Sequence, residues 1–165
     1  MNQIAISQPP TALQIDKQVA TSLTLSAGLK VEEQLTSDFD FKGYIITNDV
    51  SDKKLNETYE AIQSTMTPAD DSVIARALAQ LMALTAGKAK DIDLTLESYV
   101  QKLRQYPKDA VIESLNKLSD ENKWFPSWSE IKDDVEFRCR HRTGLLRAIE
   151  RKQNERQITR LRESA

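Results

Sequence analysis

Cysteine and histidine are almost absent from this chain, which has one of each among 165 residues: Cys139 and His141. A lone cysteine cannot form an intramolecular disulfide, and one Cys with one His falls short of the four ligands of a structural zinc site. Histidine is the usual general acid or base, but Arg140 and Arg142 would depress the basicity of this one. We therefore interpret Cys139 and His141 as structural residues.

The chain also lacks a long apolar run. Its longest strongly apolar stretch, residues 73–86, is interrupted by Arg76 and Gln80 and is shorter than the roughly 20 apolar residues that span a bilayer. The N-terminal MNQIAISQPP has neither the basic start nor the apolar run of a secretory signal. We expect no membrane association and a cytoplasmic location.

Patterns typical of phosphate-binding and metal-binding enzymes are missing as well. The only Gly-Lys pair, Gly87-Lys88, is followed by Ala89 rather than Ser or Thr and follows a helix-like segment, so it does not fit a P-loop. Neighbouring carboxylates diverge on a helix instead of converging on a cation. Examples of such acidic pairs are Glu32-Glu33, Asp70-Asp71 and Asp133-Asp134. We predict a protein that is not an enzyme, with no catalytic residue, cofactor or metal.

Charge is abundant but unevenly distributed. Residues 1–137 carry 14 Lys and Arg against 22 Asp and Glu, a net charge of −8, whereas residues 138–165 carry 9 against 3, a net charge of +6. Segregation of this kind has two interpretations. Either the basic end binds an acidic partner, nucleic acid included, or it folds back on the acidic body of its own chain.

The first 50 residues show no sustained helical periodicity and include Pro9-Pro10. Two short runs, residues 23–25 and 44–47, resemble strands, but no clear hairpin turn joins them. We predict a mostly irregular, mobile N-terminal arm over residues 1–50.

Helical signals begin at residue 51. Apolar residues spaced by three and four predict consecutive helices from residue 51 to Pro68, from there to Gly87, and then on either side of Pro107. Thr67-Pro68 supplies an N-cap and a first helical position for the second helix, and Gly87 a C-terminal cap. Ser127-Trp-Ser-Glu130 is a capping box that opens a final helix, in which Gly144 is the only hint of an interruption.

These elements predict an all-α protein: a small helical bundle with a mobile N-terminal arm and a long basic C-terminal helix. Its expected parts are the arm (residues 1–50), a helical domain (residues 51–146) and a basic helical extension (residues 147–165). Apolar residues become sparse beyond Leu146, so we expect the extension to project from the body.

Two groups of residues are candidates for contact with a partner. The extension carries cations that suit contacts to carboxylate or phosphate, most of them arginines with bidentate geometry. They are Arg147, Arg151, Lys152, Arg156, Arg160 and Arg162. The second group is Trp124 and Trp128, which either clamp the loop at Pro126 against the core or anchor a partner, since Trp is frequent among binding hot spots.

A family resemblance rests on the order of motifs in the second half of the chain. After an apolar helix from about residue 70, another helix carries Tyr99, Pro107 opens the next, and Trp124-Phe-Pro-Ser127 leads to Glu130-Ile131. This order resembles the phage replicative-helicase loader and inhibitor (replisome organiser-like) family over residues 68–137. The resemblance implies a helical domain in the host cytoplasm that binds a hexameric replicative helicase, brings it to an origin complex or restrains its ATPase, and hydrolyses nothing itself.

Three functions remain open at this point. The first is an adaptor of DNA replication that contacts the helicase or its regulators through the basic extension. The second is direct nucleic-acid binding through the Arg-rich C-terminal helix. The third is a helical regulatory protein that self-associates into a homo-oligomer.

Overall fold

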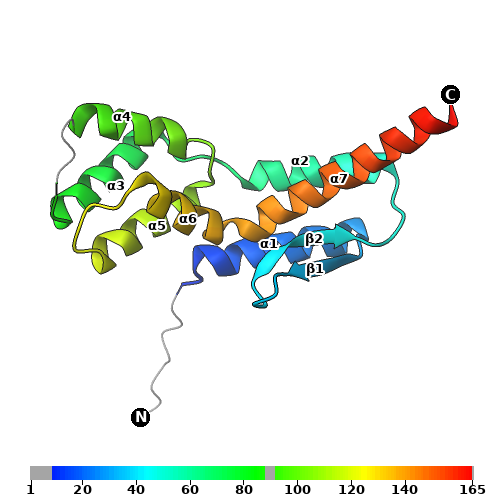
Figure 1. Ribbon diagram of the computed structural model, residues 1–165, viewed down its shortest axis with the longest axis horizontal. Helices are drawn as coiled ribbons and strands as arrows, with labels where there is room; N and C mark the ends of the chain where they lie inside the picture. Colours follow the sequence, from blue (N-terminus) through cyan, green and yellow to red (C-terminus); the bar gives the residue numbers. More distant parts are fainter. Residues whose placement is uncertain (1–8, 88–91, 165) are drawn as a thin grey trace, which may run out of the picture.

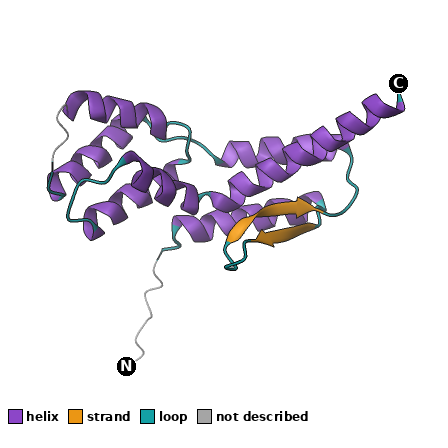
Figure 2. Cartoon of the chain, viewed as in Figure 1, coloured by secondary structure: helices purple, strands orange, loops and turns teal. Residues whose placement is uncertain are grey.

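A computed structural model describes residues 9–87 and 92–164 of the chain (Figure 1). These residues form seven helices and one two-stranded antiparallel sheet (Figure 2). In chain order the elements are α1 (Ala12–Ala27), β1 (Val31–Leu35), β2 (Phe41–Ile46), α2 (Asp52–Thr65), α3 (Asp71–Leu84), α4 (Ile92–Leu103), α5 (Lys108–Glu121), α6 (Trp128–Arg138) and α7 (Arg140–Glu163). The protein is mostly helical, as predicted, but not purely so. Within this part of the chain, no helix combines the length and apolar content needed to cross a membrane.

Two lobes lie end to end along the long axis of the molecule (Figure 1). The hairpin lobe consists of α1, β1, β2, α2 and α7, and the helical lobe consists of α3, α4, α5 and α6; each lobe has its own hydrophobic core. Helix α7 returns the end of the chain to the hairpin lobe, where it packs against β2, α1 and α2. The two lobes therefore differ from the predicted parts of the chain. A boundary at residue 51 would separate α2 from α1, and one at residue 146 would divide α7, although all three helices belong to the hairpin lobe.

The core of the hairpin lobe is formed largely where α2 and α7 meet. Leu55 and Ile62 from α2 and Leu145 and Ile149 from α7 have no exposed surface. The spacings of seven and four place each pair on one face of its helix. The apolar face of α7 thus continues to Ile149, past the expected end at Leu146, because the hairpin and α2 cover it.

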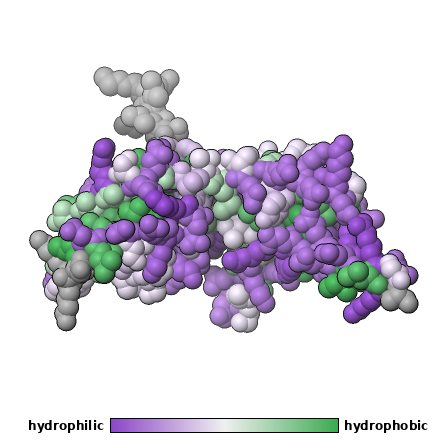
Figure 3. All heavy atoms as spheres, turned by 90° about the horizontal axis from the view of Figure 1, so that it is seen from above, coloured by the Kyte–Doolittle hydropathy of each residue, from purple (hydrophilic) through white to green (hydrophobic). Residues whose placement is uncertain are grey.

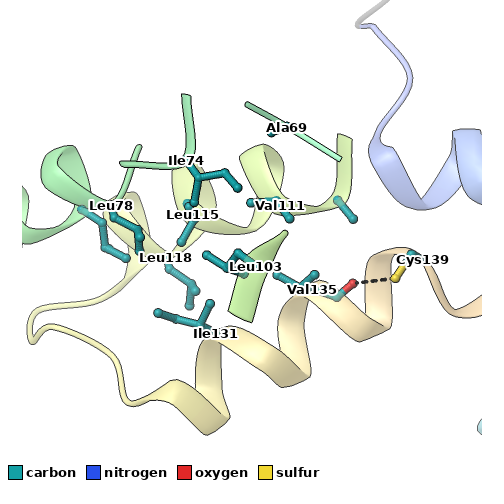
Figure 4. Packing of buried hydrophobic residues seen from close by; sticks show 12 residues of the cluster. Ala69, Ile74, Leu78, Leu103, Val111, Leu115, Leu118, Ile131, Val135 and Cys139 are labelled. Atoms are coloured by element: carbon teal, nitrogen blue, oxygen red, sulfur yellow. Dashed lines mark hydrogen bonds between the residues drawn. The ribbon is translucent and has the colours of Figure 1, made fainter. Parts of the chain in front are cut away.

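In the helical lobe, aliphatic side chains from all four helices meet in a second core (Figure 4). Leu78 from α3, Leu103 from α4, Leu115 from α5 and Val135 from α6 are at most 1% exposed. Each lies on the apolar face of an amphipathic helix, so packing these faces together removes apolar surface from water. The helices predicted from periodicity are confirmed here.

The prediction of an irregular, mobile arm is wrong for residues 12–46, which form α1 and the β1–β2 hairpin; residues 1–8 of the predicted arm lie outside the described residues. Helix α1 begins with a capping box between Thr11 and Gln14. Its buried positions recur every four residues: Ala12, Asp16, Ala20 and Thr24. Because two of these four are polar, the hydropathy pattern conceals the helical period. Of the two strand-like runs, 44–47 overlaps β2 but 23–25 lies inside α1.

The predicted boundaries of the second helix are also wrong. Helix α3 begins at Asp71 rather than at Thr67-Pro68. The Thr67 carbonyl instead accepts the Lys108 N–H at 2.9 Å, which joins the α2–α3 link to the start of α5. At the other end, Thr85 rather than Gly87 is the C-cap residue.

The predicted continuous final helix is two helices. The capping box of Ser127 and Glu130 is confirmed at the start of α6. The interruption lies at Cys139, between α6 and α7, and not at Gly144. Gly144 lies within α7, where it lets the hairpin approach the helix closely: an added Cβ would be in tight contact with the hairpin, 3.1 Å from Cζ of Phe41.

Candidate interaction surfaces

Helix α1 stabilises the break between α6 and α7. Cys139, the N-cap residue of α7, makes no side-chain capping hydrogen bond. The Asp16 carboxylate takes this role, since it accepts the N–H of His141 at 2.6 Å and that of Arg142 at 3.2 Å. N–H groups in the first turn of a helix have no acceptor within the helix. An acid on α1 therefore caps a helix that begins more than 120 residues later.

Arg142 forms hydrogen bonds to both lobes. Its side chain is 2% exposed, and its Nε donates to Asp16 at 2.6 Å. Its Nη1 donates to the Thr65 carbonyl at 2.9 Å and its Nη2 to Asp109 at 2.8 Å. A buried cation must be paired and hydrogen-bonded, and this one bonds to α1, α2 and α5 at once. The role of Arg142 is structural.

His141 and Cys139 are core residues, as interpreted from the sequence. His141 is buried, and its Nδ1 lies 2.8 Å from the Tyr44 hydroxyl. Burial, with the nearby Arg140 charge, lowers the pKa of His141 to about 4, and burial raises the pKa of the Cys139 thiol to about 11. Across residues 9–87 and 92–164, no group of three or more His, Cys, Asp or Glu is placed to hold a metal ion.

The basic extension is docked on the acidic part of its own chain. Nη1 of Arg156 and Nη2 of Arg160 each lie 2.6 Å from a carboxylate oxygen of Asp52, at the start of α2. Arg156 also pairs with Asp49. The hydrogen bonds from Arg160 and Arg156 hold the pKa of Asp52 below its usual range. Of the two interpretations of the segregated charge, Arg156 and Arg160 therefore follow the second: the basic end folds back on the acidic body of its own chain.

The other cations of the extension differ in their contacts. Arg151 donates to the Tyr44 carbonyl of β2. Arg147, Lys152 and Arg162 make no hydrogen bond or ion pair with the part of the chain that the structure describes. Three of the six predicted contact cations thus have protein partners, and three remain available.

The two tryptophans, grouped together by the sequence, lie in different environments. Trp128 is half-buried, with its ring centroid 5.4 Å from that of Tyr99 and Nζ of Lys102 4.9 Å above the ring. Trp124 is 62% exposed. One edge of its ring covers Gly87, where a Cβ would lie 3.3 Å from the indole. Trp128 therefore belongs to the packing of the helical lobe, and Trp124 is the one that faces outward.

The backbone beside Trp124 is held rigidly. The Ala86 N–H donates to the Lys123 carbonyl and the Phe125 N–H donates to the Ala86 carbonyl, both at 2.8 Å. Leu84, two residues before Ala86, is 58% exposed. We refer to Leu84, Gly87 and Trp124 as the Trp124 surface.

Apolar residues are also exposed elsewhere. Hydrophobic surface is visible at both ends of the molecule, over the α3–α4 end and near the C-terminus (Figure 3). On the last turns of α7, Ile158 is 50% and Leu161 66% exposed. In the hairpin turn, Phe39 is 83% exposed and has a left-handed backbone, with φ of 63°. The sequence prediction missed Phe39, although an aromatic residue within the polar turn Thr-Ser-Asp-Phe-Asp was a readable signal.

No family model, curated protein or solved structure matches the chain. The segment that carries the resemblance to helicase loaders, residues 68–137, nearly coincides with the helical lobe and its separate core.

Proposed function

We propose that this chain is a non-enzymatic, cytoplasmic adaptor of DNA replication that binds a protein partner through the Trp124 surface. The partner that we propose is a hexameric replicative helicase or one of its regulators. The observation that carries the proposal is the outward-facing indole of Trp124, 62% exposed on a hydrogen-bonded backbone.

The energetics of association favour this surface as a binding anchor. A tryptophan side chain buries a large apolar area when a partner covers it, and its N–H can still find an acceptor. Because Ala86 fixes the backbone on both sides of Trp124, little conformational entropy is lost on binding. Leu84, two residues before Ala86, adds a second exposed apolar side chain to this part of the chain.

The choice of a helicase rests on the resemblance. Trp124 begins the Trp-Phe-Pro-Ser segment that carries the resemblance, and this segment leads directly into α6 of the helical lobe. An adaptor needs one surface for the helicase and a second for another component, and the two-lobed architecture provides room for both.

Replacement of Trp124 by alanine tests the proposal. The purified chain and the replicative helicase of the same genome or host would be combined, and the dissociation constant measured by biolayer interferometry. We expect binding by the natural sequence and at least tenfold weaker binding by Trp124→Ala. The matched control is Leu161→Ala, which removes an equally exposed apolar side chain at the opposite end and should bind normally. Absence of binding by the natural sequence would refute the helicase, and full affinity of Trp124→Ala would refute the surface.

Direct nucleic-acid binding is the alternative that the available cations support. Arg147, Lys152 and Arg162 are without ion pairs to the described residues, whereas Arg156 and Arg160 would have to leave Asp52 before they could contact phosphate. Binding to DNA through cations releases condensed counterions, so the affinity should fall steeply with salt. A DNA affinity that is measurable and independent of salt would argue against contacts of this kind.

Self-association is the third possibility, and the end of α7 supports it. Ile158 and Leu161 are one turn apart and lie on the side of α7 opposite to Arg156 and Arg160. A sedimentation coefficient that stays constant as the protein concentration rises would exclude an oligomer formed through this face.

A further inference from the structure

A cleft lies between the two lobes beside the first turn of α7. It has a volume of about 680 Å³ and is walled by the hairpin, α6 and α7. Its lining includes Phe41, Phe137, Arg140, Gly144 and Arg147. We refer to it as the Arg140 cleft; it is separate from the Trp124 surface, because none of Leu84, Gly87 and Trp124 lines it.

Arg140 is positioned by aromatic rings rather than by an acid. Its guanidinium carbon lies 4.3 Å from the ring centroid of Phe137 and 5.6 Å from that of Phe41. Stacking of this kind fixes the plane of a guanidinium group while leaving its N–H edge available. The Nε of Arg140 is buried and has no hydrogen-bond acceptor among the described residues.

The lack of an acceptor sets Arg140 apart from its neighbours. Five of the arginines between residues 138 and 160 donate to acceptors in the protein: Arg138, Arg142, Arg151, Arg156 and Arg160. Arg140 and Arg147 do not, within the described ranges, and their spacing of seven residues places them on the same face of α7. The terminal Nη groups of Arg140 are not buried and donate to no acceptor in the described residues, so a ligand carboxylate in the cleft can accept from them in a charge-assisted contact.

Acidic residues around the cleft restrict the charge of that ligand. Glu136 is already engaged, since it accepts the Tyr106 hydroxyl at 2.9 Å and lies 3.8 Å from Nζ of Lys132. Asp40 and Asp133 also line the cleft. With Lys42, Arg140 and Arg147 in the same lining, three cations face three acids. Repulsion by the acids grows with the charge of the ligand, so they disfavour a doubly charged phosphate more than a singly charged carboxylate placed between Arg140 and Arg147.

We propose that the Arg140 cleft binds an acidic side chain of a peptide segment, with an adjoining apolar or aromatic side chain packed against Phe41 and Phe137. The donors here are guanidinium groups, which suits recognition of acidic motifs by arginines. A C-terminal carboxylate is less suited, because it is usually held by backbone N–H groups, and those of His141 and Arg142 already donate to Asp16.

Titration with three probes tests the site on the full chain. The probes are the dipeptide N-acetyl-Glu-Phe-amide, its neutral counterpart N-acetyl-Gln-Phe-amide, and inorganic phosphate. The backbone amide signal of Gly144, which lines the cleft, reports binding by NMR. We expect a saturable shift with the Glu peptide, at least tenfold weaker binding of the Gln peptide, and no saturable shift with phosphate. An equal response to the Gln peptide, no response to the Glu peptide, or saturation by phosphate alone would each overturn the proposal.

Variants locate the binding site within the cleft. Arg140→Lys keeps the positive charge but loses the stacked fork, so we expect at least fivefold weaker binding of the Glu peptide. Arg147→Gln should weaken it similarly. Arg162→Lys and Trp124→Ala should bind like the natural sequence, so that failure of this proposal and failure of the helicase proposal can be distinguished. Should Arg140→Lys not fold, Arg147→Gln and the comparison of Glu and Gln peptides still decide the question.

Discussion

Nε of Arg142 lies 2.6 Å from a carboxylate oxygen of Asp16, and the two side chains are 2% and 0% exposed. The same carboxylate caps α7 through the N–H groups of His141 and Arg142. One acid on α1 thus both neutralises the buried cation between the lobes and determines where α7 begins.

Replacement of Asp16 by alanine should cause a large loss of stability. The variant leaves Arg142 buried with only Asp109 as an acidic partner and removes the cap of α7. Removing one partner of a buried ion pair costs about 3–5 kcal/mol, and we expect a loss of this size in the free energy of unfolding measured with urea. Glu32→Ala, an exposed acid on β1, is the control. A loss below 1 kcal/mol for Asp16→Ala would contradict the proposed role.

Acidification should destabilise the protein through His141. The pKa of His141 is about 4 in the folded chain, because the ring is buried, against about 6.5 in the unfolded chain. The unfolded state therefore binds more protons between these values, so the contribution of neutral His141 is complete above pH 6.5 and is lost as the pH falls towards 4. The loss amounts to about 3 kcal/mol.

Comparison with His141→Asn isolates this effect from the titration of acidic residues. Asparagine cannot be protonated in this range, and its side-chain amide, which both donates and accepts, can replace Nδ1 as the hydrogen-bond partner of the Tyr44 hydroxyl. The difference in unfolding free energy between the two proteins should shrink or reverse between pH 6.5 and 4. A difference that is constant over this range would be inconsistent with a lowered pKa.

Gly144→Ala should destabilise the protein even though alanine favours helix formation. The new Cβ would lie 3.1 Å from Cζ of Phe41 and 3.5 Å from Cα of Gly43. Overpacking costs about 1–3 kcal/mol against a gain of about 1 kcal/mol in helix propensity, so we expect a net loss of up to about 2 kcal/mol. In a Phe41→Leu background, where the obstructing ring is absent, the same substitution should instead stabilise. The sign of its effect in the two backgrounds, measured by chemical unfolding, decides the matter.

Phe39→Gly should stabilise the protein. Phe39 has φ of 63°, a conformation that costs a side-chain-bearing residue about 1–2 kcal/mol, and its side chain is 83% exposed. Glycine avoids this cost but gains entropy in the unfolded chain, so we expect a net increase of about 0.5–1 kcal/mol in the free energy of unfolding. Phe39→Ala keeps the Cβ and should show no such gain. Equal stability of the two variants would mean that the turn is not strained.

Asp52→Asn should loosen the end of α7. Asp52 accepts hydrogen bonds from both Arg156 and Arg160, and the substitution removes the charge that they share. Amide hydrogen exchange in the last two turns of α7 should accelerate, while exchange in α4, in the other lobe, stays unchanged. Unaltered exchange at residues 157–163 would show that the extension is held by other contacts.

Local signals in the sequence predicted several elements correctly. The capping box at Ser127 and the apolar spacing of Leu55 and Ile62 depend on neighbours within one or two turns, so they can be read without knowledge of the fold. Helix α1 was not predicted, because the polar residues Asp16 and Thr24 occupy buried positions on its inner face and interrupt the apolar pattern. Their burial is possible only because distant or local partners satisfy their polar groups.

For the candidate sites too, some properties could be read from the sequence and others depend on the fold. The sequence by itself determined that the C-terminal stretch is strongly basic and rich in arginine, and it predicted the helix that carries these arginines. It also singled out Trp124 and Trp128 as neighbouring candidates without separating them. Only the tertiary structure decided which tryptophan faces outward and which arginines are engaged. Asp52 is more than 100 residues from Arg156 and Arg160, and no periodicity encodes that contact. The charge of a residue and its position on a helix face can be read from the sequence around it. Its ion-pair partner cannot, because the packing of the two cores decides which distant segments lie side by side.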